Sequence, residues 1–395
     1  MPEEFPGAAV SPGLFSHPGL LVAGAAAFGM STLFSALQPV LLTRLLEETT
    51  WDAAMAGVVV AAPFLGIALS SLLFFMRPPR ASLRKLALVF GGALVLLELL
   101  SAYLFEYRLL LLGFQFVAGF CVGALMAATS RLVAVSDDPD QSFGFIDMSA
   151  VILMSAMVVG AGAAVAAAGV MGGYGFAALV ALLYASAIAS YRESPSLMAH
   201  HDHQPEPLDV SVRSLAVIAM GILFVTSSGL GFAFMFSFAA RLGLGYEQAG
   251  SKIGLLLLAS ALACQLGGWC SARFGPRFPL LGAFVACAVG WWIVVHAQSP
   301  AMFFVGLVPA VFSLQFNFPI LLALSGSLDA HGRWAGIAAP LITSGFAWAA
   351  ILSGQVVQYR GLEALAGVTA VGMLLCAALL WPATSSTQTP VSTAA

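Results

Sequence analysis

Charged side chains are scarce in this chain. Of its 395 residues, 8% are Asp, Glu, Lys or Arg, whereas soluble globular proteins use about a quarter. Hydrophobic residues make up 60% of the chain, and the mean hydropathy is +0.97. These values exclude a soluble globular domain and indicate a protein embedded in lipid.

Other features are also missing. No run of Lys or Arg suggests a nucleic-acid partner, and the first eighteen residues have no basic region typical of a cleaved signal peptide, so we expect the first apolar segment to be retained. The linker cluster His200, His201, Asp202 and His203 is expected to be solvated. Five cysteines lack metal-site or disulfide spacing, so we expect no metal and no cofactor. They are Cys121, Cys264, Cys270, Cys287 and Cys376.

Long apolar runs rich in Leu, Ala and Gly fill most of the chain. A helix needs about 20 apolar residues to cross a bilayer core, and in lipid only helices and closed barrels satisfy the backbone. Because the runs do not alternate every second residue, the sequence predicts an all-α integral membrane protein. Its twelve transmembrane helices are predicted at 19–45, 51–76, 84–105, 108–131, 142–169, 172–191, 213–240, 246–272, 278–297, 300–326, 332–357 and 362–382.

The positions of Lys and Arg predict how the chain is oriented, because such residues in short loops stay on the cytoplasmic side. More of them lie on the N-terminal side of the predicted membrane than on the opposite side, so we expect an inner-membrane protein with both termini in the cytoplasm. The N-terminal side holds Arg77, Arg80, Arg84, Lys85, Arg131, Arg192, Arg213, Arg273, Arg277 and Arg333. The opposite side holds Arg44, Arg108, Arg241, Lys252 and Arg360.

A hydrophilic segment divides the predicted helices into six and six. Landmarks that recur in both halves suggest an internal duplication. For example, Arg44 and Arg241 each end the first helix of a half, at an offset of 241 − 44 = 197 residues. The predicted parts are a cytoplasmic tail (1–18), an N-terminal half (19–191), a cytoplasmic linker (192–212), a C-terminal half (213–382) and a cytoplasmic tail (383–395).

The turn "GGWCSARFGPRF" resembles a family signature. It is similar to the second-half copy of the loop signature of the major facilitator superfamily, in which a glycine and a short apolar stretch precede an acid and Arg-x-Gly-x-Arg. The resemblance implies a six-plus-six helix bundle with a central cavity, and alternating access by rocking of the two halves. The matching positions are Gly268, Arg273, Gly275 and Arg277.

The match departs from the family pattern in three places. Ala272 stands where the acid is expected, and the first-half copy around Arg77 and Arg80 has prolines in place of glycine. In the fourth predicted helix, "QFVAGFCVG" has Gln115 where the family has an arginine that often serves proton coupling in exporters. Coupling and direction of transport therefore stay open.

The basic turns are candidate gating loops. Arginine at a helix C-terminus interacts favourably with the helix dipole, and glycine just beyond ends the helix. Two such turns packed against neighbouring helix ends would form a polar latch; the alternative is that they anchor the chain among lipid head groups. The candidate gating residues are Arg77, Arg80, Gly268, Arg273, Gly275 and Arg277.

Two acids lie well inside predicted helices, where an ionisable group costs several kcal/mol unless it is paired or hydrated. They are Glu98 and Asp147, and both are candidates for proton coupling. The alternative for Glu98 is a structural role, and for Asp147 an ion pair with Arg77 or Arg131.

Neutral polar side chains predict a substrate cavity. Ser31, Ser35 and Gln38 recur at helical spacing and share one face. They and further polar or aromatic residues lie in the first, fourth, seventh and tenth helices, which line the cavity in the family's architecture. The alternative is hydrogen bonding and packing between helices. The candidate cavity residues are Ser31, Ser35, Gln38, Gln115, Phe232, Phe236, Gln315 and Asn317.

The residue types that are missing from the predicted spans limit the chemical class of the substrate. No span centre contains the paired Arg or Lys that a multivalent anion requires. We therefore expect a monomeric, proton-coupled secondary active transporter of a small organic solute that is neutral, weakly charged or amphipathic, for efflux or for uptake. A gradient-independent facilitator is an alternative. Two alternatives come from other functional classes. A membrane-embedded transferase would need a catalytic constellation, which this sequence lacks, so we expect no enzyme. A membrane assembly factor would need an interaction domain, which the linker hardly provides.

Overall fold

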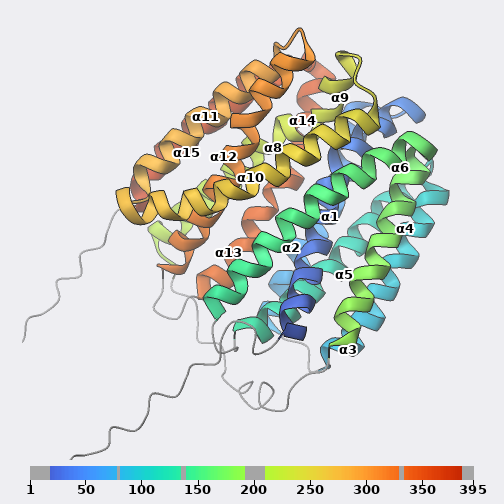
Figure 1. The fold of residues 1–395 in the computed structure, drawn as a ribbon, viewed down its shortest axis with the longest axis horizontal. Coiled ribbons are helices and arrows are strands. Elements are labelled where there is room, and N and C mark those ends of the chain that lie inside the picture. The colour runs from blue at the N-terminus through green and yellow to red at the C-terminus, as the bar shows by residue number, and fades with distance from the viewer. Residues whose placement is uncertain (1–17, 78–80, 135–138, 192–209, 329–332, 385–395) are drawn as a thin grey trace, which may run out of the picture.

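The computed structural model describes residues 18–77, 81–134, 139–191, 210–328 and 333–384 as helices joined by short turns (Figure 1). We call the helices before and after the linker the N-terminal half and the C-terminal half. The N-terminal half contains α1 (Pro18–Glu48), α2 (Ala53–Met76), α3 (Leu83–Leu86), the π-helical turn η2 (Ala87–Gly91), α4 (Gly92–Leu104), α5 (Arg108–Ala134) and α6 (Pro139–Ser190). The C-terminal half contains α8 (Val212–Ala233), α9 (Met235–Arg241), α10 (Tyr246–Phe274), α11 (Arg277–Val295), α12 (Pro300–Gly326), α13 (Arg333–Thr343), α14 (Gly345–Arg360) and α15 (Ala364–Thr384).

Eleven described helical segments are long and apolar enough to cross a membrane, and the length of one of them suffices for two crossings. The apolar stretch of α6, Phe145–Ser190, has 46 residues; as a straight helix it would be about 69 Å long, more than twice the bilayer core of about 30 Å. The backbone leaves helical geometry at Ala168 and Gly169, and a Cβ on Gly160 would lie 2.5 Å from the Phe176 ring. The chain therefore turns back there, which gives twelve crossings among the described residues and confirms the predicted fold class.

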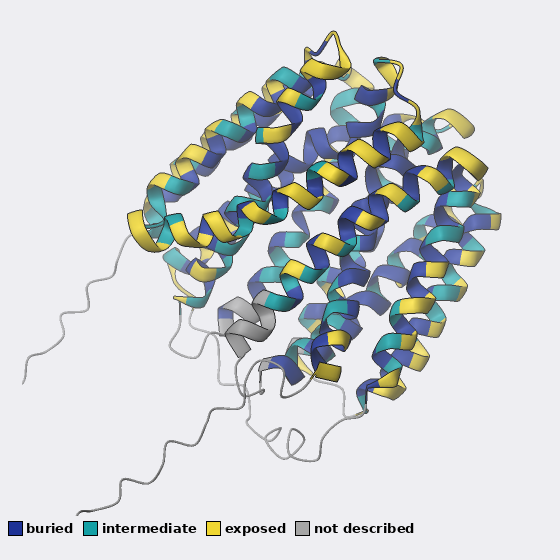
Figure 2. Cartoon of the chain, viewed as in Figure 1, coloured by how far each residue is buried: buried dark blue, intermediate teal, exposed yellow. Residues whose placement is uncertain are grey.

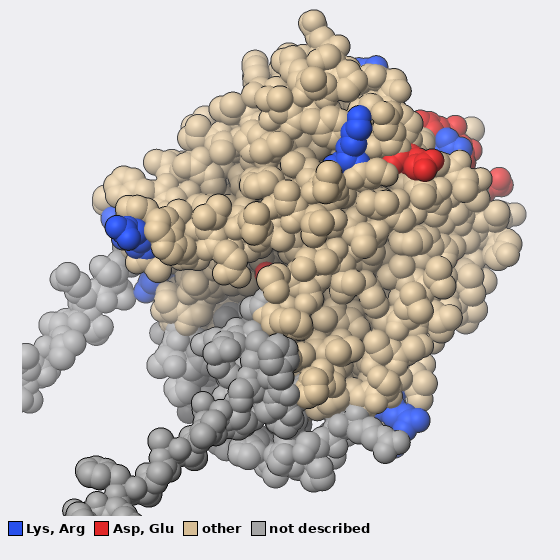
Figure 3. Space-filling model, in the orientation of Figure 1, with Lys and Arg blue, Asp and Glu red and all other residues tan. Residues whose placement is uncertain are grey.

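Most of the described charged residues lie at the two ends of the molecule. Figure 3 shows lysine, arginine and most acidic atoms near these ends, with an almost uncharged band between them. The helices are exposed on the outside of the bundle and buried where they face one another (Figure 2). This distribution fits an integral membrane protein, because lipid covers the apolar outer faces and water reaches the charged ends. We call the end at which α1 begins and α15 ends the linker face, and the opposite end the far face (Figure 1).

Glycines bring the backbones of the two halves together where α2 crosses α14. A Cβ on Gly57 would meet the carbonyl oxygen of Ala350, and a Cβ on Gly354 would meet that of Ala53. Small residues at such a crossing let two helix backbones approach closely inside a membrane. Since α2 begins and α14 ends at the far face, the halves are in direct contact on that side.

A second close crossing joins α6 to α10. A Cβ on Gly250 would lie 3.2 Å from the Gly162 Cα, and one on Gly254 would lie 2.9 Å from the carbonyl oxygen of Ser155. Ser155 Oγ also donates a hydrogen bond of 2.6 Å to the Gly254 carbonyl. Gly57 and Gly254 are 254 − 57 = 197 positions apart, the same offset as the two landmark arginines; the duplication stays a prediction.

Two predicted helices of the C-terminal half are interrupted. The predicted helix 213–240 breaks between α8 and α9 at Phe234 (φ −103°, ψ 14°). Gly231 lies three residues before this break, and glycine weakens a helix interior. The predicted helix 332–357 divides between α13 and α14 at Ser344, whose backbone stays helical (φ −58°, ψ −18°). Ser344 still donates to the Pro340 carbonyl, and Ala347 donates to the Ser344 carbonyl three residues back. Proline disturbs the turn before it, so Pro340 does not account for this break. Both breaks lie between the two faces of the membrane domain.

Candidate functional site

An amide and three phenylalanines meet between the halves; we call Gln38, Phe64, Phe232 and Phe346 the aromatic–amide site. Gln38 Nε2 donates a hydrogen bond of 3.1 Å to the Phe346 carbonyl and so joins α1 to α14. The Phe346 ring centroid lies 5.6 Å from that of Phe64 and 6.0 Å from that of Phe232. Each half contributes two of the four residues.

The helix breaks lie next to this site. Phe232 comes two residues before the break at Phe234, and Phe346 comes two residues after the break at Ser344. In transporters built from repeats, helices interrupted near the middle of the membrane form the substrate site. Gln38 is 2% exposed, and its Oε1 has no hydrogen-bond partner, so one polar atom of the site is unused.

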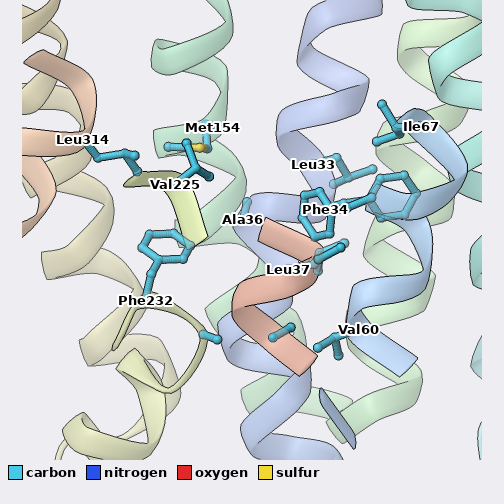
Figure 4. Close-up of a cluster of buried hydrophobic side chains, with 14 of the residues drawn as sticks. Leu33, Phe34, Ala36, Leu37, Val60, Ile67, Met154, Val225, Phe232 and Leu314 are labelled. Atoms are coloured by element: carbon cyan, nitrogen blue, oxygen red, sulfur yellow. The ribbon is translucent and has the colours of Figure 1, made fainter. Parts of the chain in front are cut away.

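The rings of the aromatic–amide site belong to a large buried apolar cluster that draws on both halves (Figure 4). The residues labelled there are Leu33, Phe34, Ala36, Leu37, Val60, Ile67 and Met154 from the N-terminal half, and Val225, Phe232 and Leu314 from the C-terminal half. Among the described residues, Glu98 is the only buried Asp, Glu, Lys or Arg, and it lies in a separate cluster with Gln115. Apolar side chains with a few placed polar groups are the usual lining of small-molecule sites.

Two serines predicted to share the Gln38 face are buried on α1. Ser31 Oγ donates to the carbonyl of Phe28 in its own helix at 2.8 Å. Ser35 lies about one turn from Gln38 and is also buried. Both stay candidate cavity residues.

Polar contacts between the halves gather toward the far face. Thr43 Oγ1 and Ser237 Oγ lie 2.8 Å apart, and the Ala53 amide donates to Gln358 Oε1 at 3.2 Å. Both pairs join an N-terminal element to a C-terminal one at the end of the molecule opposite the linker. In the part of the chain that the structure describes, the hydrogen bonds between the halves lie between this face and the level of Phe346.

Arg44 reaches across the same interface. Its guanidinium carbon lies 5.5 Å from the centroid of the Tyr246 ring, and it pairs with Glu47 at 2.8 Å and Glu48 at 2.6 Å. Phe236, a candidate cavity residue, stacks on Tyr246 at 6.0 Å. The structure therefore places Phe236 in the far-face contact and not beside Phe232.

Gln115 lies in a buried polar cluster within the N-terminal half. Its Nε2 donates to Ser101 Oγ at 3.0 Å and to Glu98 Oε2 at 3.3 Å. Glu98 and Ser101 are on α4 and are fully buried. The structure does not bring Gln115 together with Gln38, and its described contacts are the hydrogen bonds between helices that were the alternative to a cavity role.

Asp147 lies where the halves meet. It is partly exposed on α6, and its carboxylate is within electrostatic range of the Cys264 thiol on α10. Among the described residues it forms no ion pair with Arg77 or Arg131. Of the two candidate acids, only Asp147 is placed beside the other half.

Asn317 is an unpaired amide inside the C-terminal half. It is 0% exposed, and neither Nδ2 nor Oδ1 has a hydrogen-bond partner. Ser313, one turn earlier on α12, donates to the Ala310 carbonyl at 2.8 Å. Gln315 is partly exposed and makes no hydrogen bond among the described residues.

We expect Asn317→Leu to stabilise the folded protein. Leaving a buried polar group unpaired costs about 1–3 kcal/mol, and leucine has a similar shape without that cost. The free energy or midpoint of unfolding in detergent measures the effect. Ser313→Ala is the matched control and is expected to destabilise slightly, because the Ser313 hydroxyl is bonded. A lower unfolding midpoint for Asn317→Leu would show that its amide is paired in solution.

The linker-face arginines contact their own half. Arg277 donates to Thr384 Oγ1 at 2.7 Å and to the Thr384 carbonyl at 3.1 Å, and it lies 4.6 Å over the Trp381 ring. Arg273 lies over the neighbouring Trp269 and Phe274 rings.

The remaining candidate gating residues form no hydrogen bond or ion pair with the other half among the described residues, or lie outside the described residues. Gly275 ends α10 at φ +72°, as the turn predicts. A Cβ on Gly268 would have open space, and Arg77 is exposed. Arg80 and the His200–His203 cluster lie outside the described residues. A latch between halves stays a prediction.

Sequence reasoning missed two members of the site and the far-face contact. Phe64 and Phe346 are two among 29 phenylalanines, and no local pattern separates them. One signal existed: Pro340 and the pair Ser344-Gly345 interrupt an apolar run just before Phe346, as in helices broken at a site. The described residues contain no group of three metal-ligating side chains.

Comparison with known proteins supports the architecture. No family model and no curated protein matches the chain, but solved structures do. The xylose transporter XylE from E. coli, inward open, is 13% identical over 96% of this chain and 98% of that chain, with a TM-score of 0.73. The nucleoside transporter NupG is 11% identical over 92% and 97%, with a TM-score of 0.70.

A third likeness agrees with these two. A bacterial homolog of the human lysosomal transporter Spinster, inward-facing and unoccupied, is 13% identical over 93% of this chain and 95% of that chain, with a TM-score of 0.69. At such low identity the likeness establishes the arrangement of helices alone. The twelve-crossing bundle, the two halves and these likenesses together show that the chain has the fold of major facilitator superfamily transporters.

Proposed function

We propose that this protein is a secondary transporter that moves a small, neutral to weakly charged or amphipathic organic solute across the membrane by alternating access. The aromatic–amide site carries the proposal. It lies in the membrane, it is divided between two halves, and it adjoins two broken helices. A site assembled from both halves is the geometry that a rocking movement can expose to one side and then to the other.

The closed far face supports the same mechanism. Two glycine crossings and the Thr43, Arg44 and Gln358 contacts join the halves at that face. These contacts are few, small and near one end, so they can separate without disturbing the packing inside each half. Opening the far face would then require their loss, while closing the linker face would bring the basic turns together as a latch.

Proton coupling through Asp147 completes the proposal. Asp147 lies beside the other half, so rocking would change its surroundings and its affinity for a proton. Glu98 is enclosed within its own half, which favours a structural role. The alternative is a gradient-independent facilitator, favoured by one observation: Glu98 is the only buried Asp, Glu, Lys or Arg among the described residues, and it contacts Gln115 and not the aromatic–amide site.

The membrane location and orientation that we propose follow from the positions of the basic residues. The protein works as a monomer in the inner membrane, with its termini in the cytoplasm. The similar solved structures are transporters, which supports a transporter over a membrane-embedded transferase or an assembly factor. Its partners are the solute, the bilayer and protons.

Solute uptake into proteoliposomes tests this function. Compounds that raise the unfolding midpoint of the purified protein in detergent, as any ligand of the folded state must, are offered as labelled solutes to vesicles with and without a proton gradient. We expect saturable uptake that depends on the protein. Uptake equal to that of empty vesicles for every stabilising compound would contradict transport.

A further inference from the structure

The unpaired Oε1 atom of Gln38 restricts which molecules can bind at the aromatic–amide site. Only the Nε2 group of the amide can donate to the Phe346 carbonyl, so this contact fixes which way the amide points. Oε1 then faces away from that carbonyl, and it has no partner. A buried acceptor of this kind costs free energy unless a donor outside the described chain reaches it.

A second unused polar atom borders the same region from the C-terminal half. Thr226 Oγ1 is buried without a partner, although threonine in a helix commonly bonds a carbonyl of the preceding turn. A Cβ on Gly345 would lie 3.0 Å from the Thr226 backbone nitrogen, which places Thr226 beside the residue that precedes Phe346. The two unused atoms therefore flank α14 at its break.

The surrounding side chains restrict the shape and charge of the occupant. Phe346 is partly exposed and the buried rings of Phe64 and Phe232 pack against it, and rings pack well against other rings in offset or edge-on contacts. The only buried acid among the described residues, Glu98, contacts Gln115 within the N-terminal half, so no buried acid of the described chain would balance a full positive charge here, and burying an unpaired charge is costly.

From these observations we propose that the solute is an uncharged aromatic compound carrying an N–H or O–H group, which it donates to Gln38 Oε1. This inference rests on the proposed function and names its substrate class. A bare water molecule would satisfy the same oxygen, and the protein would then prefer neither member of a pair of probes that differ in one donor. The amide is thus a specificity-determining group that rejects molecules without a donor.

Paired probes test the inference. Indole is compared with N-methylindole and 2-naphthol with 2-methoxynaphthalene, since each pair differs in one donor. Dissociation constants come from the rise in unfolding midpoint with probe concentration, on the full-length protein in detergent. We expect the donor-bearing member to bind about tenfold more tightly or better in the parent protein.

Variants locate the effect. In Gln38→Leu we expect the donor preference to fall to about equal binding, because the acceptor is gone. Gln358→Leu is the matched control: it also removes an amide contact between the halves, but at the far face, so the donor preference is expected to persist. Gln38→Asn keeps an amide with both a donor group and an acceptor oxygen and is expected to retain part of the preference, which guards against a folding defect in Gln38→Leu.

The outcomes separate this inference from transport itself. Equal binding of paired probes to the parent, binding of neither member, or a preference that survives in Gln38→Leu would overturn the donor assignment. Donor-selective binding without uptake into proteoliposomes would leave the assignment and contradict transport. Uptake of solutes that lack any donor would support transport and overturn the assignment.

Discussion

Gly57→Leu is expected to keep the far face from closing and to abolish transport. A Cβ at this position already meets the Ala350 carbonyl, and a backbone group cannot rotate away as a side chain can. Overpacking typically costs about 1–3 kcal/mol, and a coupling of that size shifts a two-state equilibrium about 5- to 150-fold. The closed state should therefore lose most of its population, although each half can still fold.

Two measurements check this. Solute uptake into proteoliposomes reports the loss of transport, and labelling of Ser237→Cys by a membrane-impermeant thiol reagent reports exposure of the far face. Labelling should increase in Gly57→Leu. Gly113→Leu is the matched control, because Gly113 is exposed on the outside of the bundle and a Cβ there has open space. Normal uptake by Gly57→Leu would mean that this crossing does not close during transport.

Asp147→Asn is expected to uncouple transport from the proton gradient. The amide cannot bind and release a proton, so the free energy that couples the gradient to the solute is lost and the accumulation ratio should fall to about 1. Exchange of solute between the two sides at equal pH should continue, because that process needs only the movement of the halves. Concentrative uptake and counterflow in proteoliposomes measure the two quantities separately.

Glu98→Gln is the matched control for that result. It removes the other candidate carboxyl, whose hydrogen-bonding neighbour Gln115 belongs to the same half, so we expect concentrative uptake to be kept. Loss of accumulation in Glu98→Gln with retention in Asp147→Asn would reverse the assignment. Full accumulation in both variants would favour the facilitator.

Helix positions were predictable because lipid imposes one strong rule on the whole chain. A span must be long, apolar and helical, so every crossing follows from hydropathy, including the turn-back at Ala168 and Gly169 within α6. The breaks at Phe234 and Ser344 were not predicted, because each lies inside a run whose mean hydropathy stays high enough for a membrane span. Hydropathy does not register the loss of a backbone hydrogen bond.

Side-chain neighbours were harder to predict, for a physical reason. Helical spacing tells which residues share a face but not what that face meets. Gln38 and Gln115 looked alike in sequence, yet Gln38 bonds across the halves while Gln115 bonds within one. Their difference depends on packing between segments that are 308 positions apart in one case and 14 in the other.

The end of α15 has a consequence for the basic turns of the linker face. Arg213 donates to the Ala383 carbonyl, and Arg277 donates to Thr384. The last turn of α15 therefore accepts hydrogen bonds from two guanidinium groups. If Arg277 is to latch onto the other half, it must first give up these bonds. The final turn of α15 then acts as a competitor for the latch, and whatever unwinds it, such as a fused tag or a binding protein, would favour the conformation in which the linker face is closed.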